Sequence, residues 1–150
     1  MYGDRLQMRQ QFLDVFARLP ENPKHPHATS AAEQPLDALQ QAIATVIREH
    51  PEYHALLADR DRALAAEFPP EAGQSNPFLH LAMHLSIREQ VATDRPAGIR
   101  AFHHRLSQRL GHLEGEHRMI ECLGLALWEA QRVGTMPDEQ AYFDCIKKLV

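Results

Sequence analysis

Apolar residues recur at intervals of three and four along most of the chain, with charged and polar residues between them. This spacing places the apolar side chains on one face of an α-helix. No segment alternates apolar and polar residues over the length of a strand. The pattern predicts an all-α fold, a helical bundle of about four long helices plus two or three short ones.

Local signals set the expected helix boundaries. Asn76 followed by Pro77 suits an N-cap and the first helical residue, and Gly111 and Gly134 are suited to end helices. The helices are expected at about 4–19, 36–50, 51–57, 77–91, 96–110, 112–133 and 137–149, with a further turn or two at 59–68.

The segment from Pro20 to Pro35 carries four prolines and few apolar residues. Proline removes a backbone donor and disfavours helix, so this segment predicts a loop or flexible linker at 20–35. The chain length suits one domain with a buried core. We therefore expect a single helical domain over residues 1–150.

Composition and charge exclude some classes of function. The formal net charge is −4, which argues against a general nucleic-acid surface, because such surfaces are basic. Uninterrupted apolar runs are much shorter than a membrane span requires. The charged N-terminal residues do not resemble a secretion signal, so a cytoplasmic location is expected.

The two cysteines, Cys122 and Cys145, lie far apart in the sequence and in different expected helices. In a reducing compartment they are expected to be free thiols. A disulfide between them is the less favoured alternative.

Histidine is the unusual residue type, with ten in 150 positions. His80 and His84 are four residues apart and share a helix face with Ile87 and Val91, within a sector of about 60° at 100° per residue. Two imidazoles at this spacing can reach one metal ion. The glutamate that follows the first histidine in zinc proteases is absent, so that class of enzyme is excluded.

The expected helix at 112–133 offers two further pairs. His117 and Glu121 lie four residues apart, and so do His112 and Glu116, the second pair being nearer the centre of the apolar face. Glu114 precedes His117 by three residues, a spacing used in di-iron bundles, although those sites need a second such motif. Periodicity does not choose between the two pairs.

Other residues have simpler interpretations. His50 and His103 also lie on apolar faces, and a hydrogen-bonded polar network of histidines is the alternative to a shared ion. Trp128, Phe78 and Met83 are expected in the core. Arginines at 95, 100, 105 and 109 are expected to form a solvated face, with binding of an acidic partner as the alternative.

Several stretches resemble a bacterial family of helical proteins, the domain of unknown function 1841. They are HPEYHALL, EAGQSNPFLHLAMHLSIREQVATDRPAGIR and GEHRMIECLGLALWEAQRVGTMPDEQAYFDCI, within a match from about Ile47 to the C-terminus. The resemblance implies a small helical bacterial protein and no particular activity. Its motifs contain His50, His54, His80, His84, His117 and Glu121. The histidine-bearing bundle is also loosely similar to DinB-like metal-binding bundles, at the level of fold.

The leading hypothesis is a helical protein that binds a divalent metal, zinc, iron or manganese. Its candidate ligands are His80, His84, His117, Glu121 and His54. An open coordination position would support hydrolysis or group transfer, but the residues do not decide whether the protein is an enzyme. The alternative is a non-catalytic interaction or structural module with a hydrogen-bonded histidine core, for which a homodimer is one form.

Overall fold

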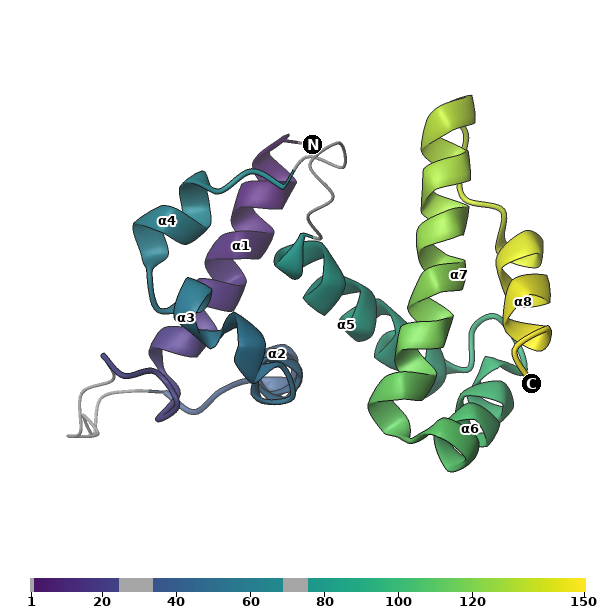
Figure 1. The fold of residues 1–150 in the computed structure, drawn as a ribbon, viewed down its shortest axis with the longest axis horizontal. Helices are drawn as coiled ribbons and strands as arrows, with labels where there is room; N and C mark the ends of the chain where they lie inside the picture. Colours follow the sequence, from purple (N-terminus) through teal and green to yellow (C-terminus); the bar gives the residue numbers. More distant parts are fainter. Residues whose placement is uncertain (1, 25–33, 69–75) are drawn as a thin grey trace. The chain divides into compact units, whose positions relative to one another are not determined.

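A computed structural model of the chain describes residues 2–24, 34–68 and 76–150 (Figure 1). Within these ranges it contains eight α-helices, one 3-10 turn and no strand, which confirms the all-α fold. Most of the predicted linker at 20–35 lies outside the described residues. The helices are α1 (Tyr2–Ala17), α2 (Ala38–Arg48), α3 (His54–Leu57), α4 (Arg60–Ala65), α5 (Pro77–Thr93), α6 (Ile99–Leu110), α7 (His112–Val133) and α8 (Glu139–Lys147), and the 3-10 turn η1 spans Pro51–Tyr53.

The chain divides into two compact units, residues 1–81 and 82–150, and the division falls within α5. The single domain expected from the length therefore stays a prediction. In the first unit, α1 packs against α2, α3 and α4. Arg9 on α1 donates to the carbonyls of Ala63 and Ala66, which joins α1 to the end of α4. The buried core of this unit includes Phe12, Leu13, Phe16, Leu19, Ile43, Val46, Ile47, Leu57 and Phe78.

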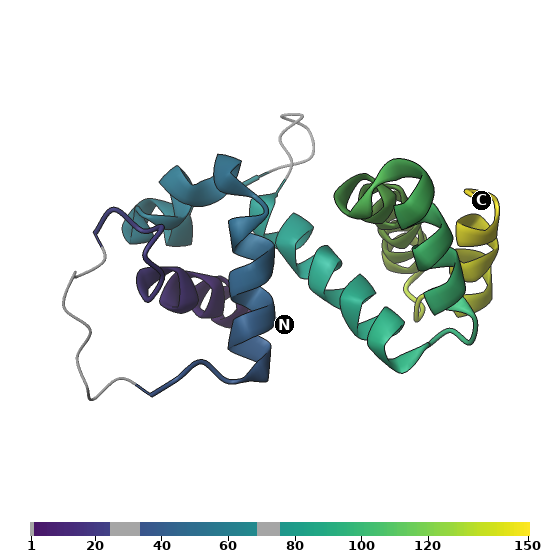
Figure 2. The ribbon, with the colours of Figure 1, turned by 90° about the horizontal axis from the view of Figure 1, so that it is seen from below.

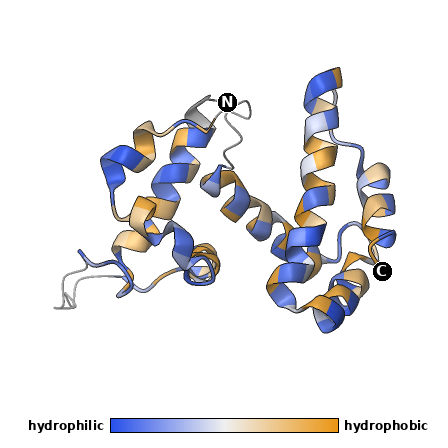
Figure 3. Cartoon of the chain, viewed as in Figure 1, coloured by the Kyte–Doolittle hydropathy of each residue, from blue (hydrophilic) through white to orange (hydrophobic). Residues whose placement is uncertain are grey.

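The second unit is built around α7, which packs against α6 and α8 (Figures 1 and 2). Hydrophobic and hydrophilic residues alternate along these helices in short runs (Figure 3). This alternation is expected of helices that bury one face. The phenol of Tyr142 on α8 donates to the Gln90 side chain on α5, at 2.6 Å. The core of this unit contains Ile87, Ile99, Leu106, Met119, Ile120, Cys122, Tyr142 and Ile146.

The helix boundaries follow the capping signals. The Asn76 side chain accepts hydrogen bonds from the backbone N–H groups of Phe78 and Leu79, as an N-cap should. Gly111 and Gly134 both have positive φ and flank α7, whose bounds match the prediction. The last helix begins later than predicted, at Glu139, because Asp138 caps it by accepting from the Ala141 N–H.

Trp128, which was predicted in the core, is exposed and retains 56% of its accessible surface. The prediction was wrong because periodicity gives the angle of a side chain around its helix but not the width of the face that neighbouring helices cover. Phe78, by contrast, is buried as predicted.

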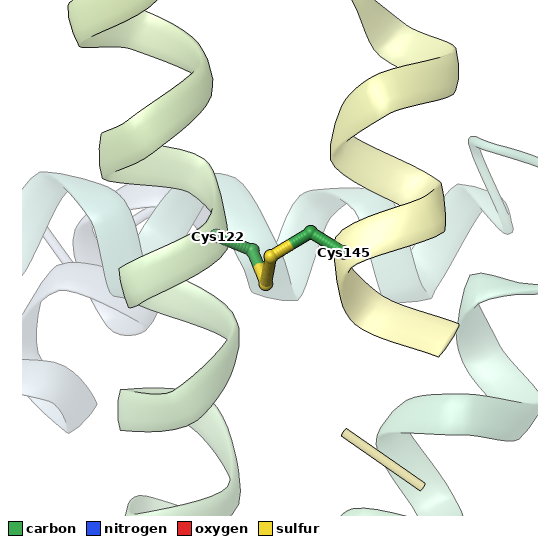
Figure 4. The surroundings of a disulfide bond; sticks show 2 residues. All are labelled: Cys122 and Cys145. Atoms are coloured by element: carbon green, nitrogen blue, oxygen red, sulfur yellow. A yellow bond between two sulfur atoms is a disulfide. The ribbon is translucent and has the colours of Figure 1, made fainter. Parts of the chain in front are cut away.

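The two cysteines form a disulfide between α7 and α8 (Figure 4). This corrects the prediction of free thiols. Separation in sequence was the wrong criterion: α7 and α8 pack side by side and bring the two Cα atoms to 5.7 Å, within the range that a disulfide spans.

Two of the arginines of α6 bind carbonyl groups at the ends of other helices. Arg100 donates to the carbonyls of Val91 and Ala92 at the end of α5, and Arg109 donates to the Leu149 carbonyl just beyond α8. Cations at helix C-termini meet the negative end of the helix dipole.

Among the described residues, none of the helices combines the length and apolarity that a membrane span requires.

Candidate functional site

A single buried carboxylate organises the polar groups of the second unit. The Glu116 side chain on α7 is fully buried, and its Oε1 lies 2.8 Å from His84 Nδ1 and 3.0 Å from Arg88 Nη2. Its Oε2 lies 3.0 Å from His103 Nε2. Both imidazoles and the guanidinium donate to the carboxylate, so Glu116 joins α5, α6 and α7 at one point.

The sequence builds this arrangement through two local features. His84 and Arg88 are four residues apart on α5, so both project from the same helix face. On α7, Gly115 precedes Glu116, and a Cβ atom at Gly115 would lie only 3.2 Å from a backbone carbon of Leu106. The missing side chain lets α6 approach α7 closely, which brings His103 within reach of the carboxylate.

The carboxylate is held in its ionised form. Burial alone would raise the pKa of Glu116, but the hydrogen bonds from His103, His84 and Arg88, with the positive charge of Arg88, outweigh it. The pKa therefore lies well below the ordinary glutamate value. The second unit contains a buried negative charge whose neighbours are all donors.

His112 adds a further imidazole at the edge of this group. Its Nε2 lies 3.6 Å from Glu116 Oε2 and 3.0 Å from Arg88 Nη2, which donates to it. His103, His112 and Glu116 each offer an atom within 4.8 Å of the others, close enough for a metal site. The Arg88 guanidinium is hydrogen-bonded to two of the three, however, and its positive charge opposes a cation there.

A second pair of imidazoles lies on the other side of His84. The rings of His84 and His117 pack edge to face, with centroids 5.1 Å apart. His117 Nδ1 lies 3.7 Å from Glu114 Oε2, in the three-residue spacing noted in the sequence. Each of the two rings therefore has a carboxylate near Nδ1, at Glu116 for His84 and at Glu114 for His117.

The other predicted ligands lie in different surroundings. His80 is one turn before His84 on α5, and its ring lies 5.2 Å from that of His50. His54 Nε2 is 2.8 Å from the Ile47 carbonyl oxygen, a contact that ties α3 to the end of α2. Glu121 is exposed on α7. The surroundings of His54 and Glu121 add no support for metal binding by either residue, and these two roles stay predictions.

Sequence reasoning left the pair His112 and Glu116 open and did not single out Arg88. The available signal was the position of Glu116 near the centre of an apolar helix face. A glutamate is almost never buried there without partners, so its position requires donors on neighbouring helices. The partners themselves could not be found without the packing of α5 and α6 on α7.

Comparisons with curated proteins and with solved structures each returned no significant match. One family model, described as a domain of unknown function (DUF1841), matches residues 4–148. The match covers nearly the whole chain, including all four helices of the second unit. The protein therefore belongs to the DUF1841 family.

Proposed function

We propose that the protein binds a divalent transition metal through His84 and His117, with Glu116 as the carboxylate that orients His84. The observation that carries the proposal is the hydrogen bond of 2.8 Å between His84 Nδ1 and Glu116 Oε1, both groups being fully buried. Metal-binding imidazoles commonly donate their second ring nitrogen to a carboxylate in this way.

The hydrogen bond has a chemical consequence for His84. Because Glu116 accepts a hydrogen bond from Nδ1–H, the neutral tautomer of His84 carries its lone pair on Nε2, the nitrogen that would coordinate. The ionised carboxylate also makes the imidazole a stronger donor to a cation. Glu114 lies in the corresponding position behind Nδ1 of His117, which supports the same assignment for that ring.

The ligand type limits the metal. Imidazole ligands suit zinc or iron, and manganese when water completes the coordination. A site with two imidazole ligands keeps positions for water, so the reaction class to examine is hydrolysis.

A different observation supports a second function, a metal-free structural network. Glu116 already accepts from three partners, His84, His103 and Arg88, and a carboxylate so occupied can serve to hold α5, α6 and α7 together. In this alternative the histidines stabilise a module that acts through its outer surfaces.

Metal content measured by inorganic mass spectrometry separates the two functions. The untagged protein is purified without chelators and, in parallel, reconstituted with zinc, iron(II) or manganese. The variants are His84→Ala and His117→Ala. His104→Ala is the matched control, because His104 is exposed on α6.

The metal proposal predicts near-stoichiometric metal in the wild type and in His104→Ala, and loss of metal in His84→Ala and His117→Ala. If the wild type takes up no metal after reconstitution, the metal proposal is wrong and the structural network becomes the better interpretation.

A further inference from the structure

The exposed face of α7 carries a regular stripe of four residues. Glu121, Leu125, Trp128 and Arg132 follow one another at spacings of four, three and four, and they fall within a sector of about 60° at 100° per residue. All four are exposed, and Leu125 and Trp128 retain 54% and 56% of their surface. This spacing is the one by which a helix packs along a partner helix.

The stripe has apolar residues at its centre and opposite charges at its ends. Glu121 lies at the N-terminal end and Arg132 at the C-terminal end. Within the chain, Arg132 pairs with Glu129 at 2.7 Å and its guanidinium lies 5.4 Å from the centre of the Trp128 ring. A surface tryptophan flanked by an arginine is a combination enriched at protein interfaces.

The order of these residues makes the stripe complementary to itself. When a second α7 lies antiparallel with Trp128 opposite Leu125, the same register places Arg132 opposite Glu121. By two-fold symmetry each of these pairs occurs twice. A parallel arrangement would place like charges together.

We propose that this face of α7 is the interface of a homodimer, formed by antiparallel packing of the α7 helices of two copies. The partner is a second copy because the reversed stripe itself matches both the charges and the spacing. The proposal concerns the exposed face of α7 and does not depend on whether the histidines bind a metal.

A pocket lies beside the stripe, and in the proposed dimer it would receive Trp128 of the second copy. It has a volume of about 270 Å³ and lies between α7 and α8, next to the Cys122–Cys145 disulfide. Leu125 belongs both to its lining and to the stripe, so an indole opposite Leu125 meets the pocket mouth. Its other lining residues include Glu129, Val133, Met136, Tyr142 and Ala141. An aromatic side chain in a pocket is the usual anchor of an interface.

Charge reversal tests the register directly. Sedimentation velocity is measured over a range of concentrations for the wild type, Glu121→Arg, Arg132→Glu and the double variant with both changes. Each single variant places like charges opposite each other twice, and is expected to weaken dimerisation by about tenfold or more. The double variant restores opposite charges and is expected to recover the wild-type dissociation constant.

Leu125→Ser tests the apolar centre, and Leu39→Ser, a similarly exposed leucine in the first unit, is its matched control. The proposal expects Leu125→Ser to yield monomer and Leu39→Ser to leave the dimer intact, with circular dichroism confirming that each variant is folded. A wild type that stays monomeric at all concentrations would overturn the proposal. So would a double variant that associates no better than the single variants.

Discussion

His84 Nδ1 lies 2.8 Å from Glu116 Oε1, and neither side chain is exposed. The carboxylate is also held by Arg88, whose guanidinium Nε lies 3.1 Å and Nη2 3.0 Å from the same oxygen. The second unit therefore contains a buried anion whose charge is balanced by a cation and oriented donors. Such a group affects stability, its pH dependence and the orientation of any imidazole that binds a metal.

Glu116→Gln should strongly destabilise the protein. The amide cannot balance the Arg88 charge, and its NH₂ group would face donors. Removing one partner of a buried charged network costs about 3 kcal/mol or more. Urea unfolding at pH 7 measures this loss. Glu114→Gln is the control, because Glu114 is about half exposed and should change stability by less than about 1 kcal/mol. Equal effects of the two changes would show that Glu116 does not organise the unit.

The same carboxylate should make stability depend on pH in the acid range. The pKa of Glu116 is lower in the folded protein than in the unfolded chain, so the folded state favours the ionised form. Its contribution is fully present above the unfolded pKa, about 4.3, and is lost as the pH falls from there towards the folded pKa.

The measurement is the difference in unfolding free energy between the wild type and Glu116→Gln at several pH values from 7 to 3. This difference is expected to stay constant above about pH 5 and to shrink below it. A difference that does not vary with pH would contradict the lowered pKa of Glu116.

The regular features of the helices were the predictable part of the fold. Local chemistry at Asn76, Gly111 and Gly134 determines where helices begin and end, and these boundaries were found from the sequence. The disulfide and the exposure of Trp128 were missed for a common reason: both depend on which helix packs beside α7, a non-local property. His84 was predicted as a site residue, but its partner Glu116 was only one of two open pairs, because periodicity does not show how α6 approaches α7.

Reducing the disulfide should destabilise the second unit. Cys122 and Cys145 are 23 residues apart, and the loop they close restricts the unfolded chain. For a loop of this length the entropy model gives about 3 kcal/mol. Thermal unfolding with and without dithiothreitol measures the effect. A variant with both cysteines changed to serine should match the reduced protein and show no response to the reductant. If the wild type does not respond either, the disulfide contributes nothing to stability.

Two glycines of α7 should respond in opposite ways to the same substitution. A Cβ atom at Gly115 would lie 3.2 Å from the Leu106 backbone carbon, whereas one at Gly124 would have no neighbour within 4 Å. Alanine favours a helix over glycine by about 1 kcal/mol, so Gly124→Ala should stabilise the protein by up to that amount.

At Gly115 the contact is with backbone that cannot rotate away, so overpacking of about 1–3 kcal/mol should exceed the gain in helix propensity. Urea unfolding should then show Gly115→Ala as less stable than the wild type. Because α6 must also move outward, the hydrogen bond from His103 to Glu116 should weaken. Amide hydrogen exchange along α6 should then be faster in Gly115→Ala, and unchanged in Gly124→Ala. A Gly115→Ala protein as stable as Gly124→Ala would show that the approach of α6 to α7 does not require glycine.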